Sequence, residues 1–423
     1  MSFNRKAILI LGAGKTGKSL LQFALRKGYL PTIVDSRDLP RLSLDLSEIK
    51  YFVQIMTNTF DTQNYHEVWI SSSFSPSHPW VQLVQRRNHV IYTDVDLFVD
   101  DNSKPLILIT GTNGKSTVVY WLQQAMNAQG ISAIACGNFG LPLLDCLDVD
   151  CQYYIVELSS YQLYWSKAID AEVSMLLNVE PDHLEWHGGF DAYKQAKQKV
   201  FLSAKKGYRL EASNGEIIGV SSQSSESEYC LDAQGVITSN RHDRHVIPPF
   251  YHGVDRLNFF AVAIVLSVLG LDLISANQTK LQQLNYRGEE TLDPKSRVWV
   301  NNSKATNIAS SAACLQRYMN NNQPVFLLLG GVFKEKSLGQ LNRIKGDLSI
   351  IFYGKDGRKM RKLYEGDARV YASASMLDAM KQADAIAPQE AVIVLAPGCA
   401  SFDAYSSFES RGAAFNQYVE EVI

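Results

Sequence analysis

The stretch GTNGKST contains the residue types that bind phosphate groups. Its glycines let the backbone curl around phosphate oxygens, its lysine supplies a positive charge, and its hydroxyls can reach Mg²⁺. The stretch fails the G-x-x-x-x-G-K-[ST] pattern, because Ile109 stands where the first glycine belongs. We still interpret it as a phosphate-binding loop. Its members are Gly111, Thr112, Asn113, Gly114, Lys115, Ser116 and Thr117.

Two side chains that follow this loop in the sequence could complete a metal site, and a lysine follows them. Glu157 ends the apolar run YYIVEL, and His183 follows the apolar run VSMLLNV. In open α/β sheets, ligands gather at the carboxyl ends of strands. Lys197 lies in FDAYKQAKQKVF, which has a helical pattern. A carboxylate, an imidazole and a hydroxyl at one sheet edge predict an Mg²⁺ shell for ATP.

A second glycine-rich stretch, GAGKTGKS (12–19), fits two motifs at once. It reads as G-x-G-x-x-G, a dinucleotide-binding pattern, and as G-x-x-x-x-G-K-[ST], a phosphate loop. Asp35 ends the next apolar run, where it suits either a ribose or a Walker B role. This context leaves both interpretations open. We assign ATP to the later loop, because the first region offers no side chains comparable to Glu157 and His183.

Short continuous apolar runs that alternate with helical patterns position these residues. Such runs are typical of parallel sheets covered on both faces. They fall into three groups, which predict an α/β protein with three domains. The runs are KAILIL (6–11), TIV (32–34) and EVWIS (67–71), then LILIT (106–110), YYIVEL (153–158) and VSMLLNV (173–179), then VWVNN (298–302), VFLLLG (325–330), LSIIFYG (348–354) and AVIVLAP (391–397). We expect a Rossmann-like N-terminal domain (1–93), a central domain (94–284) and a Rossmann-like C-terminal domain (285–423). The central domain should have a P-loop ATPase-like parallel sheet with a small antiparallel insertion at about 203–250. The run AVAIVLSVLG (261–270) predicts a buried helix, because it is too short to span a bilayer.

The composition narrows the class of protein. A formal net charge of -2 over 423 residues gives no sign of a nucleic-acid or membrane partner. The six cysteines show no zinc-binding spacing, and their scatter suits a reducing compartment. The first residues show no cleavage site for a signal peptide. We therefore expect a cytoplasmic protein without membrane insertion.

Five segments together resemble the ATP-dependent Mur ligases of peptidoglycan synthesis, in particular those that add D-glutamate. The resemblance covers essentially the whole chain. It implies that the first domain grips a uridine diphosphate and that no NAD is used. The segments are GTNGKST, ELSSYQL, NVEPDHLEWHGGFDAYKQAKQKVF, NNSKATN (301–307) and LAPGCASFDAYSSFESRG (395–412).

For ATP and metal, the resemblance implies catalytic roles for Lys115, His183 and Lys197. Two Mg²⁺ ions are expected, one on Ser116 and Glu157 and one on His183 and Lys197. The family's lysine at the position of Lys197 is carbamylated, which turns a cation into a metal-binding carboxylate. Beyond the loop, the ATP contacts implied are Asn258, Arg287, Asn302 and Lys304.

The resemblance also implies two further substrates, UDP-N-acetylmuramoyl-L-alanine and D-glutamate. The side chains implied for the UDP substrate are Lys15, Thr16, Asp35, Ser36, Arg37, Asn138 and His183. Those implied for D-glutamate are Thr306, Lys334, Ser401 and Phe408. The reaction implied passes through an acyl phosphate, and we expect a monomer.

The chain departs from the family pattern at several positions. Asn302 replaces an acid near the ATP ribose, and Asp255 stands where an asparagine is usual. LNYR (284–287) replaces L-P-H-R, and SSS (71–73) replaces S-P-G near the uracil. Alternatives remain a sister Mur ligase that adds another amino acid, a dinucleotide-dependent oxidoreductase built on GAGKTG, and a non-catalytic relative. A folylpolyglutamate synthetase would lack the UDP-binding domain.

Overall fold

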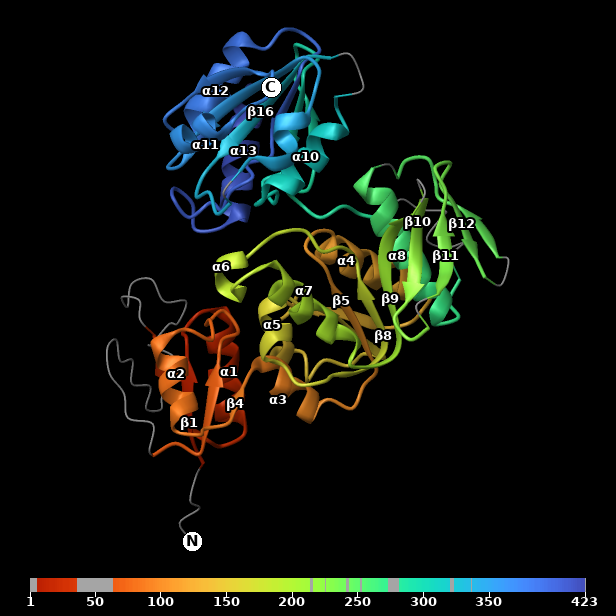
Figure 1. Ribbon diagram of the computed structural model, residues 1–423, viewed down its shortest axis with the longest axis vertical. Coiled ribbons are helices and arrows are strands. Elements are labelled where there is room, and N and C mark those ends of the chain that lie inside the picture. The colour runs from red at the N-terminus through yellow and green to blue at the C-terminus, as the bar shows by residue number, and fades with distance from the viewer. Residues whose placement is uncertain are drawn as a thin grey trace. The chain divides into compact units, whose positions relative to one another are not determined.

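The three groups of apolar runs form three separate sheets in the computed structural model (Figure 1). The structure describes residues 6–35, 64–213, 216–224, 226–240, 243–251, 253–272, 281–319, 323–335 and 337–422. These residues divide into two compact units. The first contains the N-terminal and central sheets, and the second, from Gln282 onward, contains the third sheet. The predicted α/β class is confirmed, and the boundaries at residues 93 and 284 stay predictions.

The N-terminal sheet is parallel, and its first strand is followed at once by a helix. Three of its strands were predicted from their apolar runs, and the two-residue β4 was not. In spatial order the strands are β2 (Leu30–Val34), β1 (Ala7–Leu11), β3 (Glu67–Ile70) and β4 (Ile91–Tyr92). The helices are α1 (Lys15–Arg26), α2 (Pro79–Arg86) and α3 (Asp94–Asp101). A capping box on Thr93 and Asp96 starts α3 at the link to the central sheet.

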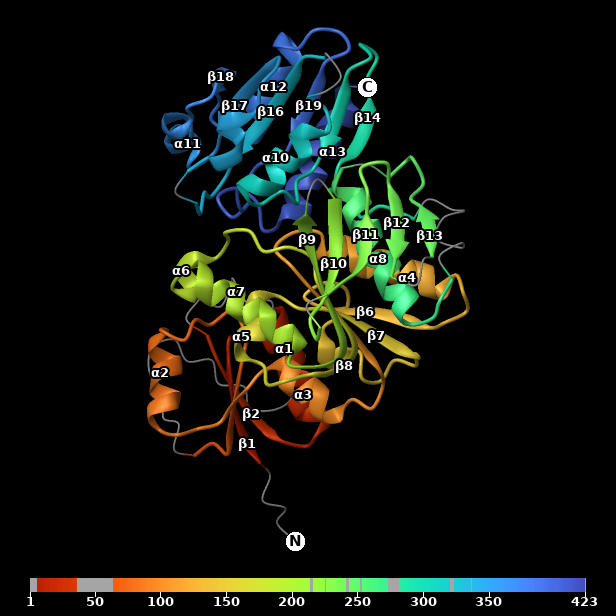
Figure 2. The ribbon, with the colours of Figure 1, turned by 45° about the vertical axis from the view of Figure 1, so that its right-hand side comes forward.

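The central sheet has nine strands and changes from parallel to antiparallel at β9 (Figure 2). Its parallel part is β8 (Asp170–Leu176), β5 (Leu106–Thr110), β7 (Tyr153–Glu157) and β6 (Ala133–Gly137). Its antiparallel part is β9 (Ser203–Ser213), β10 (Glu216–Ser221), β11 (Ser227–Leu231), β12 (Val236–Ser239) and the edge strand β13 (Arg244–Val246). The predicted insertion is therefore antiparallel, but it extends the central sheet, because β9 pairs in parallel with β8.

Helices cover the central sheet and complete its core. Ile107 and Ile109 on one face of β5 belong to the same buried cluster as α4 (Lys115–Asn127) and α8 (Val254–Val268). The predicted buried helix is thus confirmed as α8, whose residues 258–266 are all buried. The remaining helical elements are α5 (Ser160–Trp165), α6 (Leu184–His187), α7 (Phe190–Gln198) and the 3₁₀ turns η3 (Leu143–Asp145) and η4 (Lys199–Phe201).

The second unit has a six-stranded sheet that is parallel except for its edge strand β14. In spatial order the strands are β14 (Glu289–Leu292), β15 (Val298–Asn301), β19 (Val392–Leu395), β16 (Val325–Gly330), β17 (Leu348–Tyr353) and β18 (Arg369–Ala372). Its helices are α10 (Ile308–Gln316), α11 (Gly357–Leu363), α12 (Met376–Ile386), α13 (Phe408–Val422) and the 3₁₀ turn η5 (Gly339–Arg343). No helix in the described ranges is long and apolar enough to cross a membrane.

Candidate functional site

The loop GTNGKST lies between the end of β5 and the start of α4, so its backbone amides can face an anion at a helix N-terminus. Gly114 caps the helix with a φ of 85°, in the left-handed region that favours glycine. A Cβ atom at Gly114 would lie 2.4 Å from Oδ1 of Asn258. The tight turn therefore brings Asn258, expected to contact the nucleotide, against the phosphate loop.

Asn178, just beyond β8, holds the loop from the neighbouring strand. Its Oδ1 accepts hydrogen bonds from the amides of Thr112 (3.1 Å) and Asn113 (2.9 Å), and its Nδ2 donates to the Asn113 carbonyl (3.1 Å). The backbone carbonyl of Asn178 also accepts from the Thr112 amide at 2.9 Å. The sequence analysis missed this residue. A polar side chain directly after an apolar strand was the available signal.

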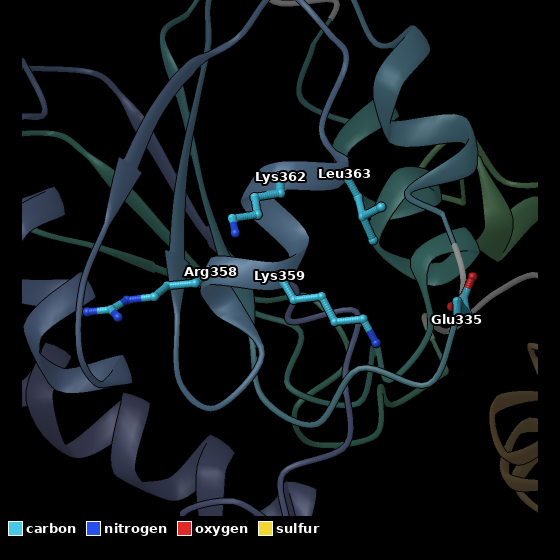
Figure 3. A pocket seen from close by; sticks show the side chains of 5 residues that line it. All are labelled: Glu335, Arg358, Lys359, Lys362 and Leu363. Carbon is cyan, nitrogen blue, oxygen red and sulfur yellow. The ribbon is translucent and has the colours of Figure 1, made fainter.

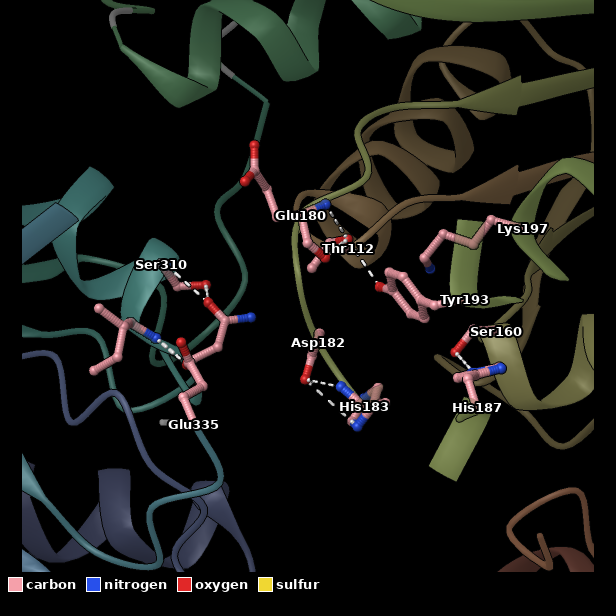
Figure 4. A network of polar contacts seen from close by, with 12 residues as sticks. Thr112, Ser160, Glu180, Asp182, His183, His187, Tyr193, Lys197, Ser310 and Glu335 are labelled. Atoms are coloured by element: carbon pink, nitrogen blue, oxygen red, sulfur yellow. Dashed lines mark hydrogen bonds and ion pairs between the residues drawn. The ribbon is translucent and has the colours of Figure 1, made fainter. Parts of the chain in front are cut away.

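Thr112 connects the loop to two further segments (Figure 4). Its Oγ1 lies 2.8 Å from the hydroxyl of Tyr193 on α7, and it accepts a hydrogen bond from the Glu180 amide at 2.9 Å. Tyr193 is buried, and its ring centroid lies 4.8 Å from Nζ of Lys197 on the same helix. The phosphate loop is thereby joined to the helix that carries Lys197. The sequence analysis also missed Tyr193.

Two lysines share one backbone acceptor in this loop. Nζ of Lys115 and Nζ of Lys197 donate to the Gly111 carbonyl at 2.8 Å and 2.7 Å, and Lys115 also donates to the Thr112 carbonyl at 2.9 Å. Lys197 is only 2% exposed. Burial, followed by the charge of Lys115, holds the pKa of Lys197 well below its ordinary value, although Asp182 and Glu157 act in the opposite direction. The lowered pKa of Lys197 favours the neutral form of its amine.

Glu157 ends β7 beside the loop, where a capping box on Ser159 and Gln162 starts α5. Its side chain is buried, and Oε1 accepts a hydrogen bond from Nδ2 of Asn138 at 2.6 Å. Oε2 is buried and has no hydrogen-bond partner among the described residues. An unsatisfied buried carboxylate oxygen is costly unless a cation or donor completes it. This oxygen therefore fits a Mg²⁺ ligand, and it brings two predicted residues, Asn138 and Glu157, together.

The described part of the chain contains no group of three His, Cys, Asp or Glu side chains that could hold a metal ion by itself. Ser116 is buried in the first turn of α4.

His183 lies at the entrance to α6 in the left-handed conformation, with a φ of 54°. Its Nδ1 lies 3.4 Å from Oδ1 of Asp182, and its ring packs on Tyr161 at 4.8 Å between centroids. His187, one turn later, has Nε2 at 3.0 Å from the Ser160 hydroxyl (Figure 4). Its Nδ1 is buried without a hydrogen-bond partner in the described ranges. Burial, with the charges of His183 and Lys197, lowers the pKa of His187 to about 4.

The loop of GAGKTGKS is tied to its own strand and helix. Gly12 has a φ of 95°, and a Cβ at Gly17 would lie 1.8 Å from the Gly12 carbonyl oxygen, so both glycines are needed. Oδ2 of Asp35, which is buried, accepts a hydrogen bond from the Ala13 amide at 2.7 Å. The hydroxyl of Ser19 donates to Oδ1 of Asp145 at 2.7 Å. Ser19 is thus buried and hydrogen-bonded to Asp145, whereas the serine of a Walker A loop binds the metal ion.

The remaining residues expected for the UDP substrate are only partly described. Lys15 is exposed at the start of α1, and its Nζ lies 3.4 Å from the Gly140 carbonyl. Thr16 is partly exposed in the same turn. Ser36 and Arg37 lie outside the described residues.

In the second unit, most of the expected residues lie at the carboxyl edge of the sheet. Nζ of Lys304 lies 4.2 Å from the ring centroid of Phe408, which brings these two together as a cation–π pair. Ser401 is buried and its carbonyl accepts from the amides of Ala404 and Tyr405. Thr306, Arg287 and Asn302 are partly exposed, and Lys334 is exposed.

Comparison with known proteins adds to this geometry. Residues 6–92 match the family model "Mur ligase MurD-like, N-terminal domain", and residues 109–218 match "Mur ligase middle domain". The chain is 28% identical to the UDP-N-acetylmuramoylalanine--D-glutamate ligase of Buchnera aphidicola subsp. Baizongia pistaciae, covering 100% of this chain and 99% of the relative. It is 29% identical to the ligase of the same name from Shewanella violacea, covering 97% and 95%.

Solved structures share the fold at lower identity. A pseudomurein peptide ligase type C from Methanothermus fervidus aligns with a TM-score of 0.59 and 15% identity over 99% of both chains. The MurF ligase from Thermotoga maritima, solved with ADP, aligns with a TM-score of 0.55 and 14% identity over 99% of this chain and 95% of that one. These likenesses concern the fold alone. The two matched models and the full-length relatives lead to one conclusion: the chain contains Mur ligase domains and is similar over its whole length to ligases of that family.

Proposed function

We propose that this protein is an ATP-dependent ligase that adds D-glutamate to UDP-N-acetylmuramoyl-L-alanine in peptidoglycan synthesis. The observation that carries the proposal is the phosphate loop whose Gly111 carbonyl accepts hydrogen bonds from Lys115 and a buried Lys197. Beside it lies a buried oxygen of Glu157 that has no hydrogen-bond partner among the described residues. The full-length similarity to ligases of this name supports the choice of substrates. An oxidoreductase built on GAGKTG would leave all these groups without a role.

Joining a carboxylate to an amine in water requires prior activation of the acid. The L-alanyl carboxylate attacks the γ-phosphorus of ATP and displaces ADP, which gives an acyl phosphate. The D-glutamate amine then attacks the acyl carbon, and phosphate leaves as the amide forms. Positioning and charge neutralisation provide most of the rate enhancement in such phosphoryl transfers.

Within this scheme, the phosphate loop binds ATP through its backbone amides and through Lys115, which moves from its carbonyl acceptors onto the phosphates. Two Mg²⁺ ions would neutralise the charge of the phosphoryl group. Ser116 and Glu157 would hold one ion, and His183 and carbamylated Lys197 would hold the other. Asn138 orients Glu157 by donating to Oε1. Asn258 contacts the nucleotide from its position against Gly114. Arg287, Asn302 and Lys304 complete the nucleotide contacts.

Carbamylation of Lys197 also belongs to this proposal. CO₂ reacts only with an unprotonated amine, and the lowered pKa of Lys197 favours that form. The resulting anion would lie close to Lys115, whose positive charge would stabilise it. Burial then excludes the water that would hydrolyse the carbamate.

The UDP substrate is assigned mainly to the first predicted domain, and D-glutamate is assigned to the third. Lys15, Thr16, Asp35, Ser36 and Arg37 hold the UDP group, with Asn138 and His183 nearer to the sugar. Thr306, Lys334, Ser401 and Phe408 hold D-glutamate, for which a lysine and hydroxyls suit the two carboxylates. We further propose a monomer that works in the cytoplasm. The six free cysteines support a reducing compartment.

The test is phosphate release from ATP with UDP-N-acetylmuramoyl-L-alanine and one candidate amino acid at a time. We expect release that depends on D-glutamate. Release with a different amino acid would assign the chain to a sister ligase. ATP binding without release in any combination would indicate a non-catalytic relative.

A further inference from the structure

A cavity of about 570 Å³ in the second unit involves none of the residues assigned to ATP or D-glutamate. It lies where β17 ends, between the turn after that strand, the start of α12 and the turn that precedes α13. Its lining residues are Tyr353, Gly354, Lys355, Ala374, Ser375, Met376, Phe402, Asp403, Ala404, Tyr405 and Arg411.

Two hydrogen-bond donors of this cavity are buried and incompletely satisfied. Arg411 is 1% exposed; its Nε donates to the Ser303 hydroxyl and its Nη2 to the carbonyls of Ser303 and Cys399. Its Nη1 has no hydrogen-bond partner in the part of the chain that the structure describes. Tyr353 is 3% exposed, and its hydroxyl is also buried and has no hydrogen-bond partner among the described residues. Leaving a charged donor unpaired inside a protein is unfavourable.

The pair Gly330 and Gly331 makes room for both donors. A Cβ at Gly330 would lie 2.1 Å from the carbonyl oxygen of Tyr353 and 2.9 Å from its Cγ. A Cβ at Gly331 would lie 2.4 Å from the carbonyl oxygen of Ala400 and 3.4 Å from Nη1 of Arg411. Gly331 also has a φ of 130°, which favours glycine. The backbone after β16 therefore lets the tyrosine ring and the guanidinium approach the same region closely.

The charges around the cavity favour an anion at these donors. Lys355 is exposed at the rim, which adds a second cation. Asp403 is the opposing charge, but its Oδ2 accepts a hydrogen bond from the Lys355 amide at 3.1 Å. The Ser375 hydroxyl is engaged with Asp378 at the start of α12. Arg411, Tyr353 and Lys355 are thus the donors available to a ligand.

We propose that this cavity binds a small oxyanion, a phosphate or a carboxylate, through Nη1 of Arg411 and the hydroxyl of Tyr353, with Lys355 at its rim. An oxyanion offers the acceptors that both buried groups lack, and it compensates the arginine charge. The proposal does not depend on which amino acid the protein adds.

A second cavity in the same unit provides a contrast (Figure 3). Its volume is about 540 Å³, and it is lined by Glu335, Arg358, Lys359, Lys362 and Leu363. Its cations are exposed side chains on α11, and none is a buried group without a partner. Surface cations of this kind attract anions weakly and without fixed geometry. It therefore serves as the control.

The test is calorimetric titration of the full chain with inorganic phosphate and, separately, with succinate, at constant ionic strength set by chloride. Lys115→Ala serves as the background, because it removes the cation through which phosphate would bind to the ATP loop. Binding in this background is expected, and whichever anion binds more tightly identifies the source. Adding Tyr353→Phe should weaken it about tenfold, since one hydrogen bond to a charged group is lost. Adding Lys355→Gln should weaken it roughly threefold.

Two matched substitutions should leave the binding unchanged: Tyr371→Phe, on β18 outside the cavity, and Lys362→Gln, in the control cavity. Tyr353→Phe removes a hydroxyl that has no hydrogen-bond partner among the described residues, so the fold should persist, and thermal unfolding of the variant checks this. If neither anion binds more tightly than chloride, water alone fills the cavity and the proposal fails. Equal affinity in Tyr353→Phe and its parent would also refute it.

Discussion

Burial lowers the pKa of Lys197, which favours the unprotonated amine that can react. Lys197→Ala should abolish ligase activity, because both the metal ligand and the contact with the Gly111 carbonyl are lost. Short carboxylic acids such as acetate should restore part of the activity by replacing the carbamate. The measurement is phosphate release with and without added acid. Lys194→Ala, an exposed lysine on the same helix, should stay active. An absence of any restoration would count against a carbamate.

His187 should make the protein sensitive to acid. Its folded-state pKa of about 4 lies below its ordinary value of 6.5, so between these pH values the unfolded chain binds a proton that the folded chain does not. Stability should therefore fall as pH drops from 6.5 towards 4, and this loss should be complete below 4. Thermal unfolding at several pH values would show it. His187→Gln should flatten this part of the pH dependence, and an unchanged slope would contradict the assignment.

The sequence pointed to residues that could carry the chemistry of the site, but it did not reveal the residues that hold the phosphate loop in place. Lys115 and Glu157 stood out only in combination, because a lysine after glycines and a carboxylate at a strand end could serve the same nucleotide and its metal. Asn178 and Tyr193 hold the loop through hydrogen bonds to residues 65 and 81 positions away in the chain. Such contacts depend on which strands become neighbours, and no local pattern encodes that.

At the scale of elements, continuous apolar runs predicted the buried parallel strands well. The missed strands differ in character. β4 has only two residues. β14 and β18 are edge strands with polar, partly exposed side chains, so their sequences contain no continuous apolar run. β6 is an edge strand too, although mostly buried. The antiparallel stretch was predicted from its lack of helical period, but its pairing with β8 was not.

The contact between α1 and β1 depends on one glycine. Gly17→Ala should destabilise the first unit by about 1–3 kcal/mol, because the added methyl meets the Gly12 carbonyl and pushes the helix away. Urea unfolding would measure this loss, and the affinity for the UDP substrate should fall as well. Gly28→Ala is the control: its φ of 73° is strained for alanine, but nothing lies within 4 Å of the new methyl. Equal losses in both variants would argue against close helix packing.

The clamp between Asn178 and the phosphate loop links two strand ends. Asn178→Ala should raise the KM for ATP about tenfold, because the Asn113 amide loses its side-chain acceptor and the Thr112 amide keeps only the backbone carbonyl of residue 178. ATP titration in the phosphate-release assay would measure this change. Asn127→Ala is a matched control: it removes an asparagine that accepts from the Ala133 amide at the far end of α4. If both variants changed KM alike, the effect would be one of general stability.

At the scale of the whole molecule, our proposal divides the substrates between the two glycine-rich loops. Lys115→Ala should abolish phosphate release, whereas Lys18→Ala should leave the affinity for ATP nearly unchanged. Lys18 lies within α1, and the neighbouring Ser19 is occupied by Asp145. Fluorescent nucleotide titration of both variants distinguishes the loops. Loss of ATP binding in Lys18→Ala would reverse the assignment. The sequence motif alone could not decide this, because the first loop fits the phosphate-loop pattern completely and the second fails it, so only the surrounding residues favour the second.

The extension of the central sheet by β9 to β13 also affects how the protein behaves in concentrated solution. A nine-stranded sheet with an open antiparallel edge could recruit a strand from another molecule and start aggregation. Its last strand, β13, has only three residues, begins with an exposed arginine, and is followed closely by Pro248 and Pro249. Short length, charge and proline each prevent a foreign strand from pairing there. The insertion that lengthens the sheet thus also ends it in a form that resists self-association.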